Sequence, residues 1–125
     1  MPTFQTLDRY LAAILTLKEK YLCVRAVDVA HYLGYSKTSV SVMLRSLREK
    51  ELITVESDGN LCLLPAGQKR TEAYMDRFTF FHRLLLSSGV EPGIAFQDAI
   101  LLSTELSAVS FDKLQAYLSK SKTQK

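Results

Sequence analysis

Apolar runs long enough to cross a membrane are absent from this sequence, because none approaches the roughly 18 to 20 residues that a spanning helix needs. The first residues also lack the charged and apolar regions of a signal peptide. Only two cysteines occur, Cys23 and Cys62, too few for a disulfide framework or a cysteine-based metal site. We therefore expect a cytoplasmic protein with reduced thiols and no membrane partner.

Motifs that carry catalysis are also missing. The sequence shows no Ser-His-Asp set, no paired carboxylates, no glycine-rich phosphate loop and no zinc motif at usable spacing. We therefore predict that the chain is not an enzyme. Its net charge of +3 is too small to indicate nucleic-acid binding by itself. The distribution of charge is more informative, because four cations lie close together beside a single acid, Glu49. These cations are Lys37, Arg45, Arg48 and Lys50.

Cap and turn residues divide the N-terminal half into short elements. Apolar periodicity predicts a first helix over about 7–19 and a second over about 27–33. Gly34 can end the second helix in the left-handed conformation that such C-caps adopt. Ser36 then offers its hydroxyl as N-cap to a third helix, about 37–50. The sequence thus predicts two helices joined by a tight turn.

A hairpin follows the third helix. Residues 52–55 and 60–64 are rich in apolar side chains, and they flank Ser57-Asp58-Gly59. An Asp-Gly pair accepts the positive φ angles of a tight hairpin turn. Helix, turn, helix and hairpin in this order predict a winged helix-turn-helix DNA-binding domain over residues 1–65, in a mainly α protein with a two-stranded wing.

The remaining sequence has the pattern of helices. The expected segments are helices over about 66–88, 94–106 and 111–118, the last capped by Ser110, and a disordered polar tail over 119–125. At about 1.5 Å per residue the first of them is roughly 35 Å long, more than a small winged helix needs. We predict that residues 66–118 form a helical dimerisation domain.

One stripe of the long helix suggests how a dimer forms. Its apolar arc is too wide for one partner helix, so we expect a second copy of the chain to cover part of it. The stripe comprises Tyr74, Phe78, Phe81 and Leu85. The alternative is that the following helices cover the stripe within one chain.

The third helix divides into a core face and a polar face. Val40, Met43, Leu44 and Leu47 follow the 3.6-residue period and are expected to face the core. The other face can reach base edges and phosphates in the major groove of double-stranded DNA. The candidate DNA-binding residues are Ser36, Lys37, Thr38, Ser39, Ser41, Val42, Arg45 and Arg48. Val42 either touches a thymine methyl group or packs on a neighbour.

Several stretches resemble the metalloregulator family that includes the diphtheria-toxin repressor and the manganese transport regulator. They are RYLAAI (9–14), VRAVDVA (24–30), SVSVML (39–44) and HRLL (82–85), with further likeness at 106–107 and 110–112. The resemblance covers about 7–118 and is closest to the short, two-domain members. It implies a homodimeric repressor that binds a palindromic operator when divalent metal favours the DNA-binding arrangement.

The resemblance also marks six positions where family members hold metal. In this sequence they carry Arg9, Ala12, His82, Ile100, Ser103 and Thr104, so only His82 is a competent ligand. The residual candidates for a displaced site are His82, Asp8, Asp98 and Glu105. Asp98 and Glu105 share a helix face, but their backbones lie about 10 Å apart. We expect no cofactor, with divalent Mn or Fe bound only if a displaced site exists.

These observations lead to one hypothesis and two alternatives. Arg9, paired with Asp98 or Glu105, and apolar packing by Ile100 would hold permanently the arrangement that metal stabilises in relatives. DNA binding would then be constitutive. The alternatives are a winged-helix module that has lost DNA binding and contacts protein, and a regulator with a displaced metal site.

Overall fold

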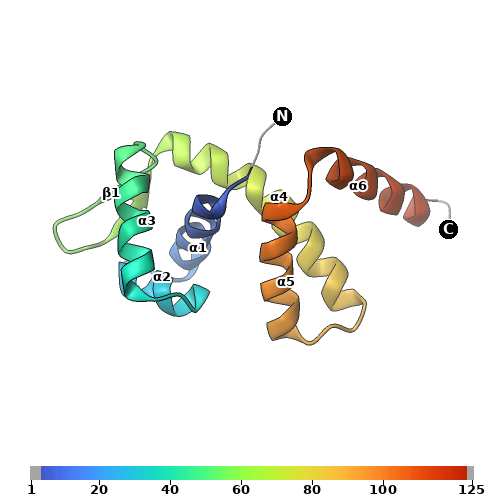
Figure 1. Ribbon diagram of the computed structural model, residues 1–125, viewed down its shortest axis with the longest axis horizontal. Coiled ribbons are helices and arrows are strands. Elements are labelled where there is room, and N and C mark those ends of the chain that lie inside the picture. The colour runs from blue at the N-terminus through green and yellow to red at the C-terminus, as the bar shows by residue number, and fades with distance from the viewer. Residues whose placement is uncertain (1–3, 124–125) are drawn as a thin grey trace. The chain divides into compact units, whose positions relative to one another are not determined.

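The computed structural model describes residues 4–123, apart from the side chains beyond residue 120. Within that range the fold is mainly helical with one antiparallel hairpin, as predicted (Figure 1). The elements are α1 (Thr6–Lys20), α2 (Ala26–Leu33), α3 (Lys37–Glu49), β1 (Ile53–Val55), β2 (Leu61–Leu63), α4 (Pro65–Ser87), α5 (Pro92–Glu105) and α6 (Ala108–Thr123). None of these helices combines the length and apolar character that a membrane span requires.

The chain divides into two compact units, and the division lies inside α4. The winged-helix unit is Thr6–Tyr74 and contains α1 to α3, the hairpin and the first part of α4. The C-terminal unit comprises residues 4–5 and 75–123, with the rest of α4, α5 and α6.

Helix α1 forms the centre of the winged-helix unit, where it contacts α2, α3 and β2. Leu11 and Ile14 of α1 are fully buried, as the apolar period of that helix predicts. On α3 the expected core stripe is buried at Val40, Leu44 and Leu47, whereas Met43 is only half-buried. This packing fixes which face of α3 is left for solvent.

The turn between α2 and α3 is set by local capping. Gly34 adopts a φ of 75°, and its N–H donates to the Ala30 carbonyl, so the predicted left-handed C-cap is confirmed. The Ser36 hydroxyl accepts a hydrogen bond from the Ser39 N–H at 3.1 Å, which confirms Ser36 as the N-cap of α3. These two residues determine where α3 begins and the direction in which it leaves α2.

The hairpin pairs Ile53 with Leu63, and Gly59 of its turn has a φ of 90°. Of the Asp-Gly pair, Gly59 alone takes a positive φ, because the turn closes through a hydrogen bond from Gly59 N–H to the Glu56 carbonyl. Helix α4 then starts directly against the hairpin. A Cβ atom on Gly67 would collide with the carbonyl oxygen of Leu52, so this close approach requires glycine.

The C-terminal unit is built around an aromatic cluster. Phe81 of α4, Ala99 of α5 and Phe111 of α6 are buried together. The Phe81 and Phe111 ring centroids lie 5.8 Å apart. Partly buried apolar side chains complete the cluster, namely Phe78, Phe80, Leu85, Leu102 and Leu106.

Two helix starts in this unit differ from the prediction. Helix α5 begins at Pro92, because the Glu91 carboxylate accepts from the N–H groups of Gly93 and Ile94. Helix α6 begins at Ala108 and not at Phe111, because the Ser107 hydroxyl accepts from the N–H of Ser110, the residue predicted as the cap.

The end of the chain also differs from the prediction. Helix α6 continues to Thr123, so residues 119–123 are helical and the expectation of a disordered tail is wrong for them. Serine, lysine and threonine are compatible with a helix, so the polar composition of this segment does not prevent α6 from continuing. Residues 124–125 of the expected tail lie outside the described range.

The predicted dimer stripe is largely internal. Tyr74 and Phe81 are 1% and 3% exposed within a single chain, so their part in a dimer interface stays a prediction that this burial does not support. Phe78 and Leu85 are partly buried against the aromatic cluster. The α5 and α6 helices supply the cover of Phe81 that the sequence pattern left open. Other large apolar side chains of α4 to α6 are exposed instead, namely Leu84, Leu86, Ile94, Leu101, Val109, Leu114 and Tyr117.

Candidate nucleic-acid interface

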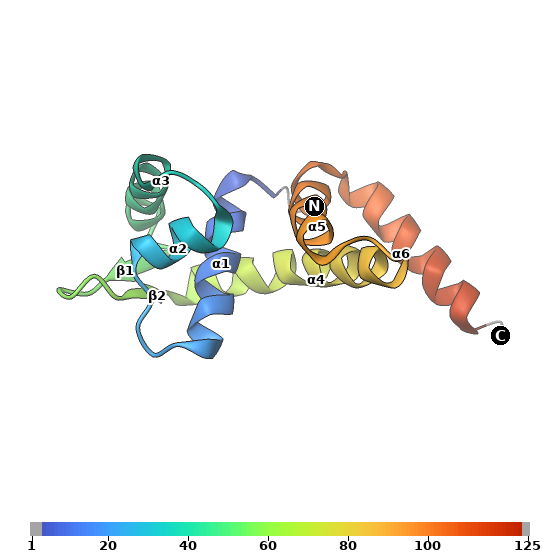
Figure 2. The same cartoon turned by 90° about the horizontal axis from the view of Figure 1, so that it is seen from below.

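Helix α3 lies on the outside of the winged-helix unit (Figures 1 and 2), and the residues of its polar face are exposed. All eight candidate DNA-binding residues are exposed: Ser36, Lys37, Thr38, Ser39, Ser41, Val42, Arg45 and Arg48. Val42 is 62% exposed, so it does not pack on a neighbour. The face therefore combines short hydroxyl side chains, one methyl-bearing side chain and two guanidinium groups on a single helix.

The beginning of α3 has the electrostatics of an anion site. Its first turn carries Lys37 and no acidic residue, so nothing offsets the positive end of the helix dipole. The hydroxyls of Ser36 and Ser39 are joined at 2.9 Å and serve the cap. Thr38 and Ser41 lie outside this cap pair. We infer that the cap serines set the position of the helix end, where a phosphate group would be accommodated.

The hairpin is tied to α1 and α2 by side chains that the sequence reasoning did not single out. The Asn60 carboxamide oxygen accepts from Val24 N–H at 2.9 Å and from Lys18 Nζ at 3.0 Å. Arg25 Nε donates to the Asp58 carbonyl at 2.8 Å at the tip of the wing. The wing is therefore held at a fixed position beside α2. An asparagine directly after the Asp-Gly turn was the available signal, but its partners lie more than thirty residues away.

A buried ion pair joins α1 to α4 in the winged-helix unit. The Asp8 carboxylate is fully buried and accepts from Arg70 Nε at 2.6 Å and from Nη2 at 3.0 Å. The hydrogen bond to Asp8 raises the pKa of the Arg70 guanidinium. Asp8 was a residual candidate for a displaced metal site, and its carboxylate is instead bound to the guanidinium of Arg70. Arg70 was missed because it is 62 residues from Asp8.

His82 is packed between aromatic rings. It stacks on Phe78 with ring centroids 5.1 Å apart and meets Phe96 edge-on at 6.3 Å. The other two candidates, Asp98 and Glu105, are exposed on α5. Among residues 4–123, no three histidine, cysteine, aspartate or glutamate side chains are grouped so that they could hold a metal ion.

The hydroxyl groups at two of the family's ligand positions turn back onto their own helix. Ser103 donates to the Ala99 carbonyl at 2.6 Å, and Thr104 donates to the Ile100 carbonyl at 2.9 Å. Hydroxyls that donate in this way are poor ligands for Mn²⁺ or Fe²⁺, which bind carboxylates and imidazoles far better. The donor set that this chain offers therefore does not fit a resident divalent metal.

A second arginine supplies a cation inside the C-terminal unit. Arg77 is 4% exposed and donates from Nη1 to the carbonyls of Ser103 and Leu106 at 3.2 and 2.6 Å. Its guanidinium lies 5.0 Å from the ring centroids of both Phe4 and Phe111. Burial lowers the pKa of this guanidinium. Arg77 thereby fastens α4 to the carboxyl end of α5, a role that no local sequence pattern revealed.

Arg9 has its observed partner within the winged-helix unit. It donates from Nη1 to the Tyr35 hydroxyl at 3.3 Å, and the Tyr35 ring lies 5.6 Å from that of Tyr10. The pairing of Arg9 with Asp98 or Glu105 stays a prediction, since those acids belong to the other unit.

The exposed helix, its serine cap and the anchored hairpin define the class of the protein. It is a winged-helix, DNA-binding transcriptional regulator. Residues 3–61 match the family described as "Iron dependent repressor, N-terminal DNA binding domain", so this part of the chain is similar to that family. The resemblance stated from the sequence is therefore confirmed. The family consists of transcriptional repressors and not of enzymes, as predicted.

Relatives match over most of the chain. The transcriptional regulator MntR of Salmonella typhimurium strain LT2 is 29% identical over 113 residues, which is 90% of this chain and 72% of that protein. MntR of Escherichia coli O6:H1 is 28% identical over 116 residues, which is 93% of this chain and 75% of that protein.

Solved structures agree on the fold. A manganese-dependent transcriptional repressor in complex with manganese gives a TM-score of 0.78 at 22% identity over 91% of this chain. The manganese regulator SloR gives 0.76 at 19% identity over 95% of this chain. This chain spans 53% and 55% of those two chains, about half their length. At this identity the likeness shows the fold alone.

Proposed function

We propose that the protein is a homodimeric repressor that binds operator DNA through α3 without control by a divalent metal. The observation that carries this proposal is the α3 surface, where a buried apolar stripe leaves every candidate contact residue exposed. The relatives named MntR are transcriptional regulators, which supports the same class of function. A DNA regulator of this kind would act in the cytoplasm.

Each part of α3 has a distinct proposed role. The helix end at Ser36 and Lys37 would bind a backbone phosphate, because its N–H groups and positive charge attract an anion. Thr38, Ser41 and Val42 would face base edges, where hydroxyls and a methyl group discriminate between base pairs. The guanidinium groups of Arg45 and Arg48 would reach a guanine or a phosphate.

Metal-independence follows from the replacement of ligands by other contacts. Asp8 is neutralised by Arg70, and the hydroxyls of Ser103 and Thr104 are bonded to their own helix. A metal would have to displace a buried ion pair to recruit Asp8, which is energetically costly. The two arginines at Arg70 and Arg77 would supply permanently the cationic cross-links that hold their helices together.

A dimer fits the surface of the C-terminal unit. Seven large apolar side chains are exposed on α4, α5 and α6, and such exposure in one region favours burial by a partner. A second copy of the chain is the proposed partner, because two winged helices related by a twofold axis would match the two halves of a palindromic operator.

Fluorescence anisotropy with a labelled duplex at a series of salt concentrations tests this function. The duplex would be selected by the protein from a random pool. Phosphate neutralisation predicts that the logarithm of the binding constant falls linearly with the logarithm of salt, with a slope of about −4 or steeper for a dimer. Absent or salt-insensitive binding would favour a winged-helix module that contacts protein.

A further inference from the structure

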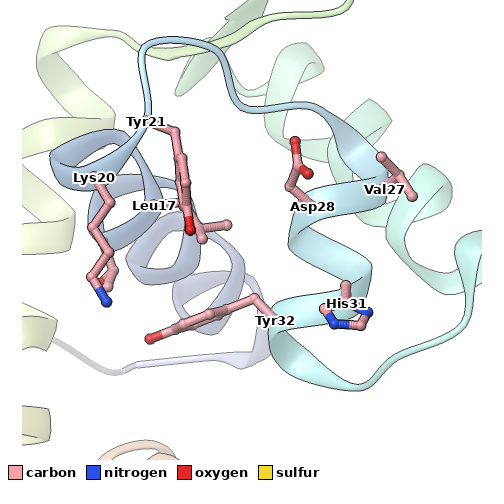
Figure 3. A pocket seen from close by; sticks show the side chains of 8 residues that line it. Leu17, Lys20, Tyr21, Val27, Asp28, His31 and Tyr32 are labelled. Atoms are coloured by element: carbon pink, nitrogen blue, oxygen red, sulfur yellow. The ribbon is translucent and has the colours of Figure 1, made fainter.

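A pocket of about 410 Å³ lies between α1 and α2 (Figure 3). Each side contributes residues at positions i, i+1, i+4 and i+5, so two facing stripes form its walls. The lining residues are Thr16, Leu17 and Lys20 from α1, Tyr21 directly after it, and Val27, Asp28, His31 and Tyr32 from α2. The volume suits a molecule of about a dozen non-hydrogen atoms. No role in DNA binding has been assigned to any of these residues.

Large apolar side chains are exposed at the mouth of the pocket. Tyr21 and Val27 line the pocket and are 59% and 53% exposed. Leu22, the next residue after Tyr21, is 99% exposed. Inside the pocket Leu17 is buried, so the apolar surface continues from the mouth to the floor. A flat apolar group would gain contacts here that water cannot provide.

The polar side chains of the pocket differ in whether they already have hydrogen-bond or ion-pair partners. One Asp28 carboxylate oxygen accepts from Arg25 N–H at 2.8 Å, where it caps α2. Tyr32 is hydrogen-bonded to Thr16, and burial raises the pKa of its hydroxyl, which therefore stays neutral. Among the described residues Lys20 has no carboxylate partner, and Figure 3 shows its amine on the same side of the view as the Tyr32 hydroxyl.

We propose that this pocket binds a small aromatic carboxylate. The ring would lie between Tyr21 and Tyr32 over Leu17, where stacked or edge-on aromatic contacts are favourable. The carboxylate would meet the ammonium group of Lys20 in a charge-assisted hydrogen bond. The Asp28 carboxylate also lines the pocket, but one of its oxygens already accepts from Arg25 N–H, whereas the Lys20 amine opposes a cation and would pair with a carboxylate.

The position of the pocket leaves α3 accessible. Figure 2 shows the connection between α1 and α2 on the side of the winged-helix unit away from α3. A ligand would contact α2, which leads into the Gly34 turn and α3, so occupancy is placed to alter how α3 is held. The binding proposal does not rest on the proposed DNA function, because it is measured on the free protein.

The probe is 3-phenylpropionate, titrated into ¹⁵N-labelled protein and followed by two-dimensional amide spectra. We expect saturable shifts at residues 16–32 with a Kd on the order of 1 mM, the range for a fragment of this size. The uncharged 3-phenylpropionamide should bind about tenfold more weakly, because it cannot pair with the Lys20 charge. Shifts spread over the whole surface, or none, would overturn the proposal.

Two substitutions separate this site from general charge effects. Lys20→Met should weaken 3-phenylpropionate binding about tenfold, whereas Lys69→Met, which removes an exposed lysine from α4, should leave it unchanged. Tyr21→Ala should weaken the acid and the amide equally, because the ring contributes to both. The spectra of the variants also show that they are folded. Equal binding by wild type and Lys20→Met would contradict the proposal.

Discussion

The carboxylate of Asp8 on α1 accepts two hydrogen bonds, of 2.6 and 3.0 Å, from the guanidinium of Arg70 on α4, although 62 residues separate them. Asp8 is fully buried, while the Arg70 side chain is about one-third exposed. The pair thus closes α4 onto α1 with its negative partner inside and its positive partner at the surface. This asymmetry makes the consequences of removing each partner different.

Arg70→Met should destabilise the protein more than Asp8→Asn. Removing Arg70 takes the guanidinium away from a fully buried carboxylate, and we expect the free energy of unfolding to fall by about 2 to 4 kcal/mol after allowing for the exposure of the arginine. Asp8→Asn leaves a guanidinium that water can reach, so its cost should be about 1 to 2 kcal/mol. Urea unfolding measures both free energies. Equal losses below about 0.5 kcal/mol would show that the pair is not a structural cross-link.

Arg77 should stabilise the C-terminal unit through its shape as well as its charge. Arg77→Met leaves the carbonyls of Ser103 and Leu106 without this donor and removes two ring contacts, so we expect a loss of about 2 to 4 kcal/mol. Arg77→Lys keeps the charge but not the planar group, and should recover less than half of that loss. Arg83→Met, on the exposed face of α4, is the matched control and should change stability by less than about 0.5 kcal/mol.

Two buried tyrosines should make the stability of the protein depend on pH in the alkaline range. Burial raises the pKa of Tyr10 and of Tyr32 above the ordinary value of 10.0. Their contribution is therefore fully present below pH 10.0 and is lost as the pH rises from there through the raised pKa values. Absorbance titration of the phenolates should show Tyr10→Phe and Tyr32→Phe each removing a late-titrating group. Each variant should still contain the other late-titrating tyrosine. Phenolates that all titrate at the ordinary pKa in both variants would contradict this.

Arg45→Ala should weaken DNA binding and also reduce its salt dependence. If Arg45 binds a phosphate, the salt slope should fall in magnitude by about 1 per site contacted. If it binds a guanine, affinity for the selected duplex should fall about 10-fold or more while the affinity for unrelated duplexes is retained. Arg83→Ala serves again as the control. If the Arg45→Ala protein bound every duplex with unchanged affinity, the proposal that α3 is the recognition helix would be contradicted.

Dimerisation should depend on the exposed apolar side chains of α5 and α6 rather than on the long-helix stripe. Leu101→Asp places a charge where an apolar contact is proposed and should weaken self-association by about tenfold or more. Gln97→Asp, an exposed polar position on the same helix, is the matched control. Sedimentation equilibrium measures the association constant. A monomeric wild type, or equal association by both variants, would contradict the proposed interface.

Local sequence signals allowed the helices and turn of the winged-helix unit to be predicted, whereas contacts between residues far apart in the sequence could not be predicted. Gly34, Ser36 and Gly59 act on their immediate neighbours, so caps and turns could be read from sequence. The α6 start was missed because two serines compete, and Ser107 is the one that accepts from Ser110 N–H.

In the candidate site, too, local features could be predicted from the sequence and long-range contacts could not. Exposure of Arg45 and Val42 followed from helical periodicity on one element. The partners of Arg70 and Arg77 depend on which helices pack together, which no spacing in the sequence encodes. The burial of Phe81 likewise depended on how α5 and α6 fold back, so an apolar stripe alone could not distinguish an internal face from a dimer face.

The central claim is that a repressor fold of the metal-dependent type binds DNA here without metal. The most direct measurement is the Kd of the protein for its selected duplex, after purification with a strong chelator, with EDTA present and then with Mn²⁺ or Fe²⁺ added under anaerobic conditions. We predict that these values agree within about twofold, since residues 4–123 show no group of three metal-binding side chains through which a metal would shift the equilibrium. A chelator-induced loss of about tenfold or more, restored by Mn²⁺ or Fe²⁺, would contradict the account.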